Sequence, residues 1–91
     1  MRTYQQFIGG AWVAAPSGRT TQTCNPADVR EVVAEYAAGD AADALAAIAA
    51  AERAAPAWAN TTPVARGRVL SKASQLIETR KAELAELLTR E

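Results

Sequence analysis

The chain changes character at Gly39, and this boundary constrains its fold more than any other feature of the sequence. Residues 1–38 are rich in glycine, threonine and β-branched side chains, which favour strands and turns. Residues 39–91 are dominated by alanine, leucine and charged side chains, which favour helices. We therefore predict an α/β chain, with an N-terminal hairpin and short strands over residues 1–38 and two or three helices over residues 39–91.

A tight hairpin is predicted near the N-terminus. Apolar pairs at residues 7–8 and 12–13 flank Gly9-Gly10, and adjacent glycines tolerate the positive φ values that two-residue hairpin turns require. Asn25 precedes Pro26, which disfavours helical backbone at Asn25 and predicts a break in the chain. The sequence further predicts a turn, an extended run and a strand at residues 15–18, 19–24 and 31–37.

The helical half is predicted to begin at Asp40, whose carboxylate can cap the first free backbone N–H groups. We expect Pro56 to end this helix and Trp58 to lie in the connecting loop. Thr62 and Pro63 are typical of a helix cap and a first helical position, and the helical phase breaks near residues 79–81. The second helix is expected to bury one side, formed by Val64, Leu70, Ala73, Leu76 and Ile77, and to expose Arg66, Arg68, Lys72, Gln75 and Glu78.

The chain has few side chains with which to build a core. It has 91 residues, and about half of its 49% hydrophobic residues are alanine, which buries little area. Small domains usually need a disulfide, a metal or a partner, but one cysteine and no histidine exclude an internal disulfide and the usual structural zinc site. We expect the isolated chain to fold poorly. The helical pattern also stops at Glu91 without a capping glycine or proline, which predicts that the chain is a piece of a larger protein.

Charge and hydropathy point away from nucleic acids and membranes. Ten basic and ten acidic residues cancel, so the sequence carries no electrostatic footprint for nucleic acid. No apolar run approaches the roughly 20 residues needed to cross a bilayer, and no apolar signal segment follows Met1. Together with the lone cysteine, these features predict a cytoplasmic protein whose partners are apolar surfaces.

The residues that could carry chemistry are better explained by structure. Cys24 is the only strong nucleophile, but no histidine exists to activate it, so a structural role is expected. Gly9-Gly10 lacks the remaining glycines of a dinucleotide fingerprint. Two carboxylate pairs at helical spacing, Asp40 with Asp43 and Glu83 with Glu86, are expected to serve capping and solvation. We therefore predict no catalytic and no cofactor-binding residue in this chain.

Several short motifs, in this order and at these spacings, resemble the start of the aldehyde dehydrogenase superfamily over the whole chain. They are Phe7-Ile8-Gly9-Gly10-x-Trp12-Val13, Asn25-Pro26-Ala27, Gly39-Asp40 before the alanine-rich helix, Trp58, Arg66-Gly67-x-x-Leu70, Ala73, Leu76-Ile77-Glu78-x-Arg80 and Glu83-Leu84-Ala85. The stretch at residues 25–33 is similar to bacterial members that act on semialdehydes, including 2-oxoglutarate semialdehyde.

The resemblance implies that residues 1–91 are the N-terminal part of a coenzyme-binding domain. The full enzyme would oxidise an aldehyde or semialdehyde to a carboxylate with NAD or NADP. In this family a cysteine thiolate attacks the aldehyde, a glutamate activates water, and an asparagine and a backbone N–H stabilise the oxyanion. By this resemblance those residues and the cofactor-binding residues lie beyond Glu91, and Cys24 is not the nucleophile. Thr23 matches a position near the monovalent cation that some members bind.

The expected partner is the remainder of the dehydrogenase fold or a second copy in a homo-oligomer. The missing C-terminal closure favours a truncated dehydrogenase over a genuine short protein of the same ancestry that acts as an interaction module. An unrelated alanine-rich helical domain is a third reading, against which the ordered motifs argue.

Overall fold

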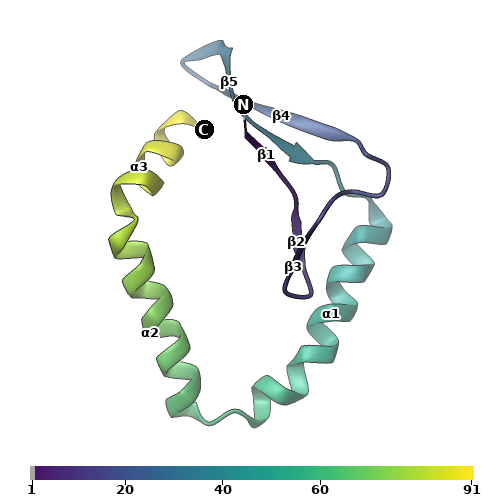
Figure 1. The fold of residues 1–91 in the computed structure, drawn as a ribbon, viewed down its shortest axis with the longest axis vertical. Coiled ribbons are helices and arrows are strands. Elements are labelled where there is room, and N and C mark those ends of the chain that lie inside the picture. Colours follow the sequence, from purple (N-terminus) through teal and green to yellow (C-terminus); the bar gives the residue numbers. More distant parts are fainter. Residues whose placement is uncertain (1) are drawn as a thin grey trace.

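The computed structural model describes residues 2–91 and confirms the predicted α/β class. Five short strands precede three helices, as drawn in Figure 1. The strands are β1 (Arg2–Tyr4), β2 (Gln6–Ile8), β3 (Ala11–Val13), β4 (Thr20–Asn25) and β5 (Asp28–Ala37). The helices are α1 (Ala41–Asn60), α2 (Pro63–Thr79) and α3 (Lys81–Arg90).

The strands form two separate sheets. In the larger sheet the central strand β5 pairs in parallel with β1 and antiparallel with β4, in the order β1-β5-β4. Tyr4 and Tyr36, which are register partners, stack with ring centroids 5.4 Å apart. The strand predicted at residues 31–37 begins earlier, at Asp28, because the chain reverses directly after the break at Asn25-Pro26.

The second sheet is the predicted hairpin. Strands β2 and β3 pair antiparallel around Gly9 and Gly10, whose φ values of 63° and 81° lie in the left-handed region. Glycine reaches this region without the steric penalty that a Cβ atom brings. The register places Phe7 opposite Trp12, with ring centroids 5.0 Å apart, and both rings remain mostly exposed.

Helix α1 begins with the expected cap. The Asp40 carboxylate accepts hydrogen bonds from the N–H groups of Ala42 (3.0 Å) and Asp43 (3.2 Å), and the Asp43 carboxylate accepts one from the Asp40 N–H (2.9 Å). This reciprocal capping box satisfies three N–H groups that no helical carbonyl can reach.

The predicted end of α1 at Pro56 is wrong. The helix continues through Pro56 to Asn60, so Trp58 lies in the last turn of α1 and not in a loop. A proline inside a helix loses one backbone hydrogen bond and costs about 3 kcal/mol. The neighbours of Pro56 are mostly alanine, which has the highest helix propensity of all residues, and this favours continuation of the helix.

Helices α2 and α3 follow the predicted boundaries. The Thr62 hydroxyl accepts from the Ala65 N–H at 3.2 Å, and Pro63 occupies the first helical position. Arg80, with φ −101° and ψ 15°, interrupts the helical path between α2 and α3. None of the helices among residues 2–91 has the length and apolar character needed to cross a bilayer.

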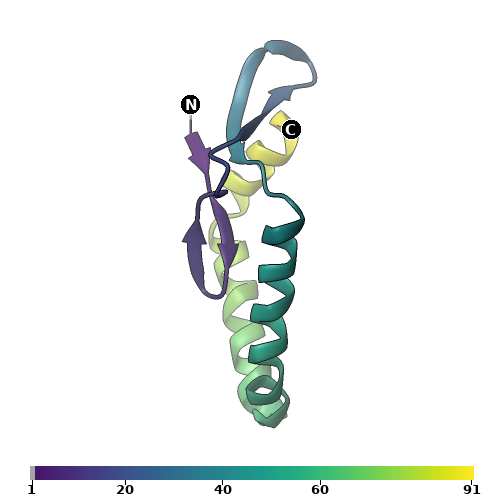
Figure 2. The same ribbon diagram turned by 90° about the vertical axis from the view of Figure 1, so that its right-hand side faces the viewer.

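The chain is an open arch, not a closed globule. In Figure 1, α1 and α2 form two limbs that diverge from their junction, while the sheet and both termini lie at the opposite end. Figure 2 shows that the arch is thin when viewed from its side. The radius of gyration is 16.7 Å, whereas a compact domain of this length has about 12 Å.

The arch leaves most apolar side chains in contact with solvent. Within residues 2–91 the only buried hydrophobic residues are Ala15 and Ala34, and no helix has a buried residue. The accessible surface is 7128 Å², against about 5,100 Å² for a compact protein of this mass. The described chain therefore lacks a hydrophobic core of its own.

Candidate functional site

Cys24 lies in a structural setting. It is a free, partly exposed cysteine near the end of β4, opposite Val32, at a point where the pairing of β4 with β5 is irregular. The chain has no histidine, and a cysteine nucleophile needs a nearby base, a cation or a helix N-terminus. No hydrogen bond from a side chain of residues 2–91 reaches its sulfur. Nothing in this geometry activates Cys24.

The two carboxylate pairs are occupied by other roles or open to solvent. Asp40 and Asp43 form the capping box of α1. Glu83 forms an ion pair with Arg80 at 2.7 Å, and this hydrogen-bonded pair lowers the pKa of Glu83. Glu86 is exposed. Within residues 2–91 no three His, Cys, Asp or Glu side chains gather into a metal-binding group.

The hairpin and α1 enclose a shallow notch. Its lining includes Phe7, Gly9, Ala47, Ala51 and Arg53. A Cβ atom at Gly9 would lie 3.8 Å from the Ala50 Cβ, so the hairpin tip touches the helix. Gly9-Gly10 thus serves as a turn packed against α1, and no convergent polar groups mark the notch as a ligand site.

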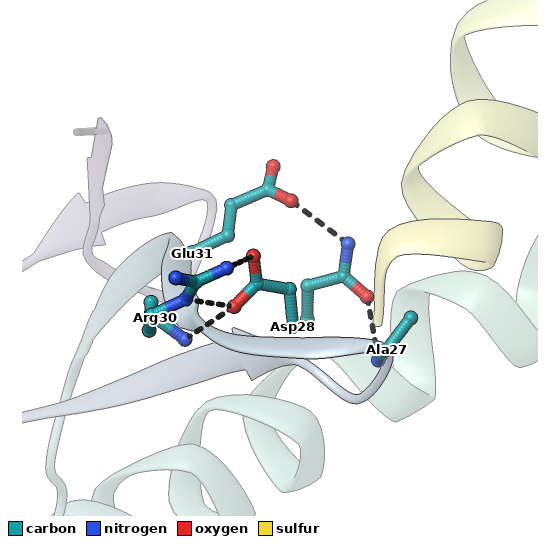
Figure 3. A network of polar contacts seen from close by, with 5 residues as sticks. Ala27, Asp28, Arg30 and Glu31 are labelled. Atoms are coloured by element: carbon teal, nitrogen blue, oxygen red, sulfur yellow. Dashed lines mark hydrogen bonds and ion pairs between the residues drawn. The ribbon is translucent and has the colours of Figure 1, made fainter.

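The most developed polar network lies at the β4–β5 turn and is drawn in Figure 3. The Asn25 side-chain oxygen accepts from the Ala27 N–H at 2.9 Å, and its amide donates to Glu31 at 2.8 Å. Arg30 binds the Asp28 carboxylate through two side-chain nitrogens, each at 2.9 Å. The side-chain hydrogen bonds from Arg30, followed by the hydrogen bond from its backbone N–H, lower the pKa of Asp28.

The same network holds the end of α3 against the sheet. Arg90 donates to Glu31 at 3.0 Å and 2.5 Å, and the Tyr36 hydroxyl donates to Glu91 at 2.7 Å. The hydrogen bond from Asn25, followed by that from Arg90, lowers the pKa of Glu31. The hydrogen bond to Glu91 raises the pKa of Tyr36. These groups stabilise ionised or hydrogen-bonded partners and are not poised for proton transfer.

Sequence reasoning did not find the contact between Glu31 and Arg90, because the two residues are 59 positions apart and carry no shared motif. It also placed Arg66 on the exposed side of α2, which is wrong. Arg66 is only partly exposed, and its Nε atom is shielded from solvent without an acceptor within residues 2–91. Its angular position on α2 also falls among the apolar residues and not among the charged ones.

The described residues form a regular framework with little chemistry of its own. Its strands and helices are well formed, its apolar faces are uncovered, and its polar groups hold turns and helix ends in place. Among the described residues Cys24 has no base beside it, and the two hydroxyl–carboxylate pairs, Thr20 with Glu35 and Tyr36 with Glu91, lie on exposed surface.

The chain belongs to the aldehyde dehydrogenase family, whose profile matches residues 12–91. It is 44% identical over 87 residues to an alpha-ketoglutarate semialdehyde dehydrogenase of Haloferax volcanii, covering 96% of this chain and 18% of that protein. It is 39% identical over 89 residues to an alpha-ketoglutaric semialdehyde dehydrogenase of Bacillus subtilis, covering 98% of this chain and 18% of that protein.

Solved structures of dehydrogenases are also similar to this chain. A structure of 3,6-anhydro-L-galactose dehydrogenase in complex with NAP matches with a TM-score of 0.93 and 39% identity, over 99% of this chain and 19% of that one. A structure of an NAD-dependent aldehyde dehydrogenase from Sinorhizobium meliloti matches with a TM-score of 0.87 and 34% identity. The chain thus spans less than a fifth of the length of these relatives.

Proposed function

We propose that this chain is the N-terminal portion of an NAD(P)-dependent aldehyde dehydrogenase that oxidises an aldehyde or semialdehyde to a carboxylate. The observation that carries the proposal is the match of 99% of this chain to 19% of a solved dehydrogenase, with a TM-score of 0.93. The two relatives named above as semialdehyde dehydrogenases support the semialdehyde class of substrate.

Within such an enzyme the role of residues 1–91 is structural. Cys24 has no base beside it, and no helix of the described residues follows a glycine-rich turn that could hold a pyrophosphate, so the chain does not fit the cofactor by itself. NAD or NADP and the reacting groups would be held by residues outside this chain. We place the enzyme in the cytoplasm, with the rest of the fold and a homo-oligomer partner as its contacts.

Thr23 is proposed as a position near a monovalent cation in the assembled enzyme. It lies in β4 opposite Ala34, at the edge of the three-stranded sheet. One threonine contributes a hydroxyl and a carbonyl oxygen, and an alkali cation needs several oxygen ligands. The remaining ligands would have to come from beyond this chain.

The proposal is tested with a chimera. The matching N-terminal residues of the Bacillus subtilis relative are replaced by this chain, to which they are 39% identical. We expect the chimera to oxidise α-ketoglutaric semialdehyde, measured as reduction of NAD+ or NADP+ in separate reactions, while residues 1–91 alone show no turnover. A folded relative that loses all turnover in the chimera, or turnover by residues 1–91 alone, would contradict the proposal. The first result would instead favour a short non-catalytic protein of the same ancestry.

A further inference from the structure

Helix α2 carries an apolar stripe that no part of residues 2–91 covers. With about 100° between successive residues, five apolar side chains of α2 fall within an arc of about 120°, whereas Val64 lies on the opposite side of the helix. The five are Val69, Leu70, Ala73, Leu76 and Ile77. The four large ones are exposed by 56%, 65%, 55% and 61% in the order Val69, Leu70, Leu76 and Ile77. Burying the apolar side of such an amphipathic helix against another surface is favourable.

Arg66 lies within this stripe, one helical turn before Val69 and Leu70. Its guanidinium Nε–H is shielded from solvent and has no acceptor within the described residues. The other cations of α2 differ, because Arg68 and Lys72 project outside the arc and are exposed. A shielded donor without an acceptor is unfavourable. An acceptor on the surface that covers the stripe would relieve this cost and fix the position of the planar arginine head group.

The area that this chain leaves exposed indicates what kind of surface covers it. The chain exposes about 2,000 Å² more than a compact protein of its mass, which is more than twice the roughly 800 Å² that each partner buries in a standard protein interface. The relatives have about five times the length of this chain, so the same architecture in them is accompanied by a large body of protein. A small ligand would cover only part of a helix face of this length.

We propose that the α2 stripe docks on the body of the dehydrogenase fold beyond Glu91, with Arg66 as its polar anchor. Arg66 donates to a carboxylate or main-chain carbonyl oxygen set in an otherwise apolar surface. The apolar residues supply most of the buried area, and Arg66 sets the register of α2 on that surface. This inference rests on the proposed function and names the contact by which the segment performs it.

The test uses the same chimera, with substitutions on two sides of α2. Arg66→Met keeps the apolar stem but removes the donors, and Arg66→Lys keeps the charge without the fork of donors. Arg68→Met is the matched control on the exposed side. We expect Arg66→Met to lower the melting temperature of the chimera by about 2–3 °C, because an acceptor is left buried without its partner. Arg66→Lys is expected to fall between, and Arg68→Met to stay within about 0.5 °C of the parent.

A second experiment uses residues 1–91 alone. Since the acceptor is absent from residues 1–91, Arg66→Met should leave the helicity of the isolated chain unchanged by circular dichroism. Equal shifts for Arg66→Met and Arg68→Met in an active chimera would overturn the anchor while leaving the proposed function intact. A loss of helicity in the isolated Arg66→Met chain would also overturn it, by placing the role of Arg66 inside the segment. Failure of the unsubstituted chimera would count against the proposed function instead.

Discussion

Separating residues 1–91 from any covering protein is expected to abolish cooperative folding. The open arch exposes about 2,000 Å² more than a compact protein of the same mass. With somewhat more than half of that surface apolar, and about 25 cal/mol for each Å², the hydrophobic stabilisation that is lacking amounts to about 25–30 kcal/mol. The net stability of a folded domain is only about 5–15 kcal/mol. No capping box or surface ion pair can offset a deficit of this size.

The assay is thermal and urea unfolding of the isolated chain, followed by far-UV and near-UV circular dichroism. We expect a broad helical transition, little near-UV signal from the exposed rings of Trp12 and Trp58, and self-association as concentration rises. The chimera, in which the same apolar faces would be covered, should unfold in one sharp step. A sharp transition of the isolated chain, coincident by both probes and shown by sedimentation equilibrium to come from a monomer, would refute the reasoning.

Four further outcomes are expected, measured in the chimera unless the isolated chain is named. Asp40→Ala should destabilise α1 by about 1 kcal/mol and speed hydrogen exchange of the N–H groups that it caps, whereas Asp40→Asn should cost only a few tenths; equal exchange in the two variants would argue against the cap. Gly10→Ala should cost about 1 kcal/mol because φ is 81° there, and a thermal melt measures the loss. A Cβ at Gly67 meets open space within this chain, so Gly67→Ala should raise the helicity of the isolated chain by circular dichroism, and an unchanged or lower helicity would contradict this. Glu31 has a pKa below its ordinary 4.5, so its contribution to stability is complete above pH 4.5 and is lost as the pH falls through the lower folded value. Glu31→Gln should remove this part of the acid dependence, and an unchanged profile of melting temperature against pH would contradict it.

Local chemistry made several elements predictable from the sequence. Gly9-Gly10 forms the expected turn because only two residues and their φ values decide it. Asp40 and Thr62 cap helices because each cap depends on N–H groups two or three residues away. These features need no knowledge of the rest of the fold.

The errors concern features that depend on neighbouring residues or on segments distant in the sequence. Pro56 was expected to end α1, but the alanine-rich flanks favour continuation of the helix beyond it. Arg66 was placed with the charged residues by type, although its angular position sets it among the apolar ones. The contact of Glu31 with Arg90 depends on how the arch brings α3 back to the sheet, and no local pattern encodes that.

For the candidate site residues, too, local roles were predictable but roles that depend on other parts of the protein were not. The sequence assigned structural roles to Cys24 and to the carboxylate pairs. The structure places Cys24 in a strand, Asp40 and Asp43 in a capping box, and Glu83 in an ion pair with Arg80. The role of Thr23 stays a prediction, because the other oxygen ligands of a cation would lie beyond this chain.

The intact mass of the polypeptide that carries these residues in its source cell tests the central claim most directly. Peptides from residues 1–91 should be recovered on a polypeptide of about five times the mass of this chain, since the chain spans 18–19% of its relatives. A polypeptide with the mass of these 91 residues alone would contradict the account and identify a short protein without dehydrogenase activity of its own.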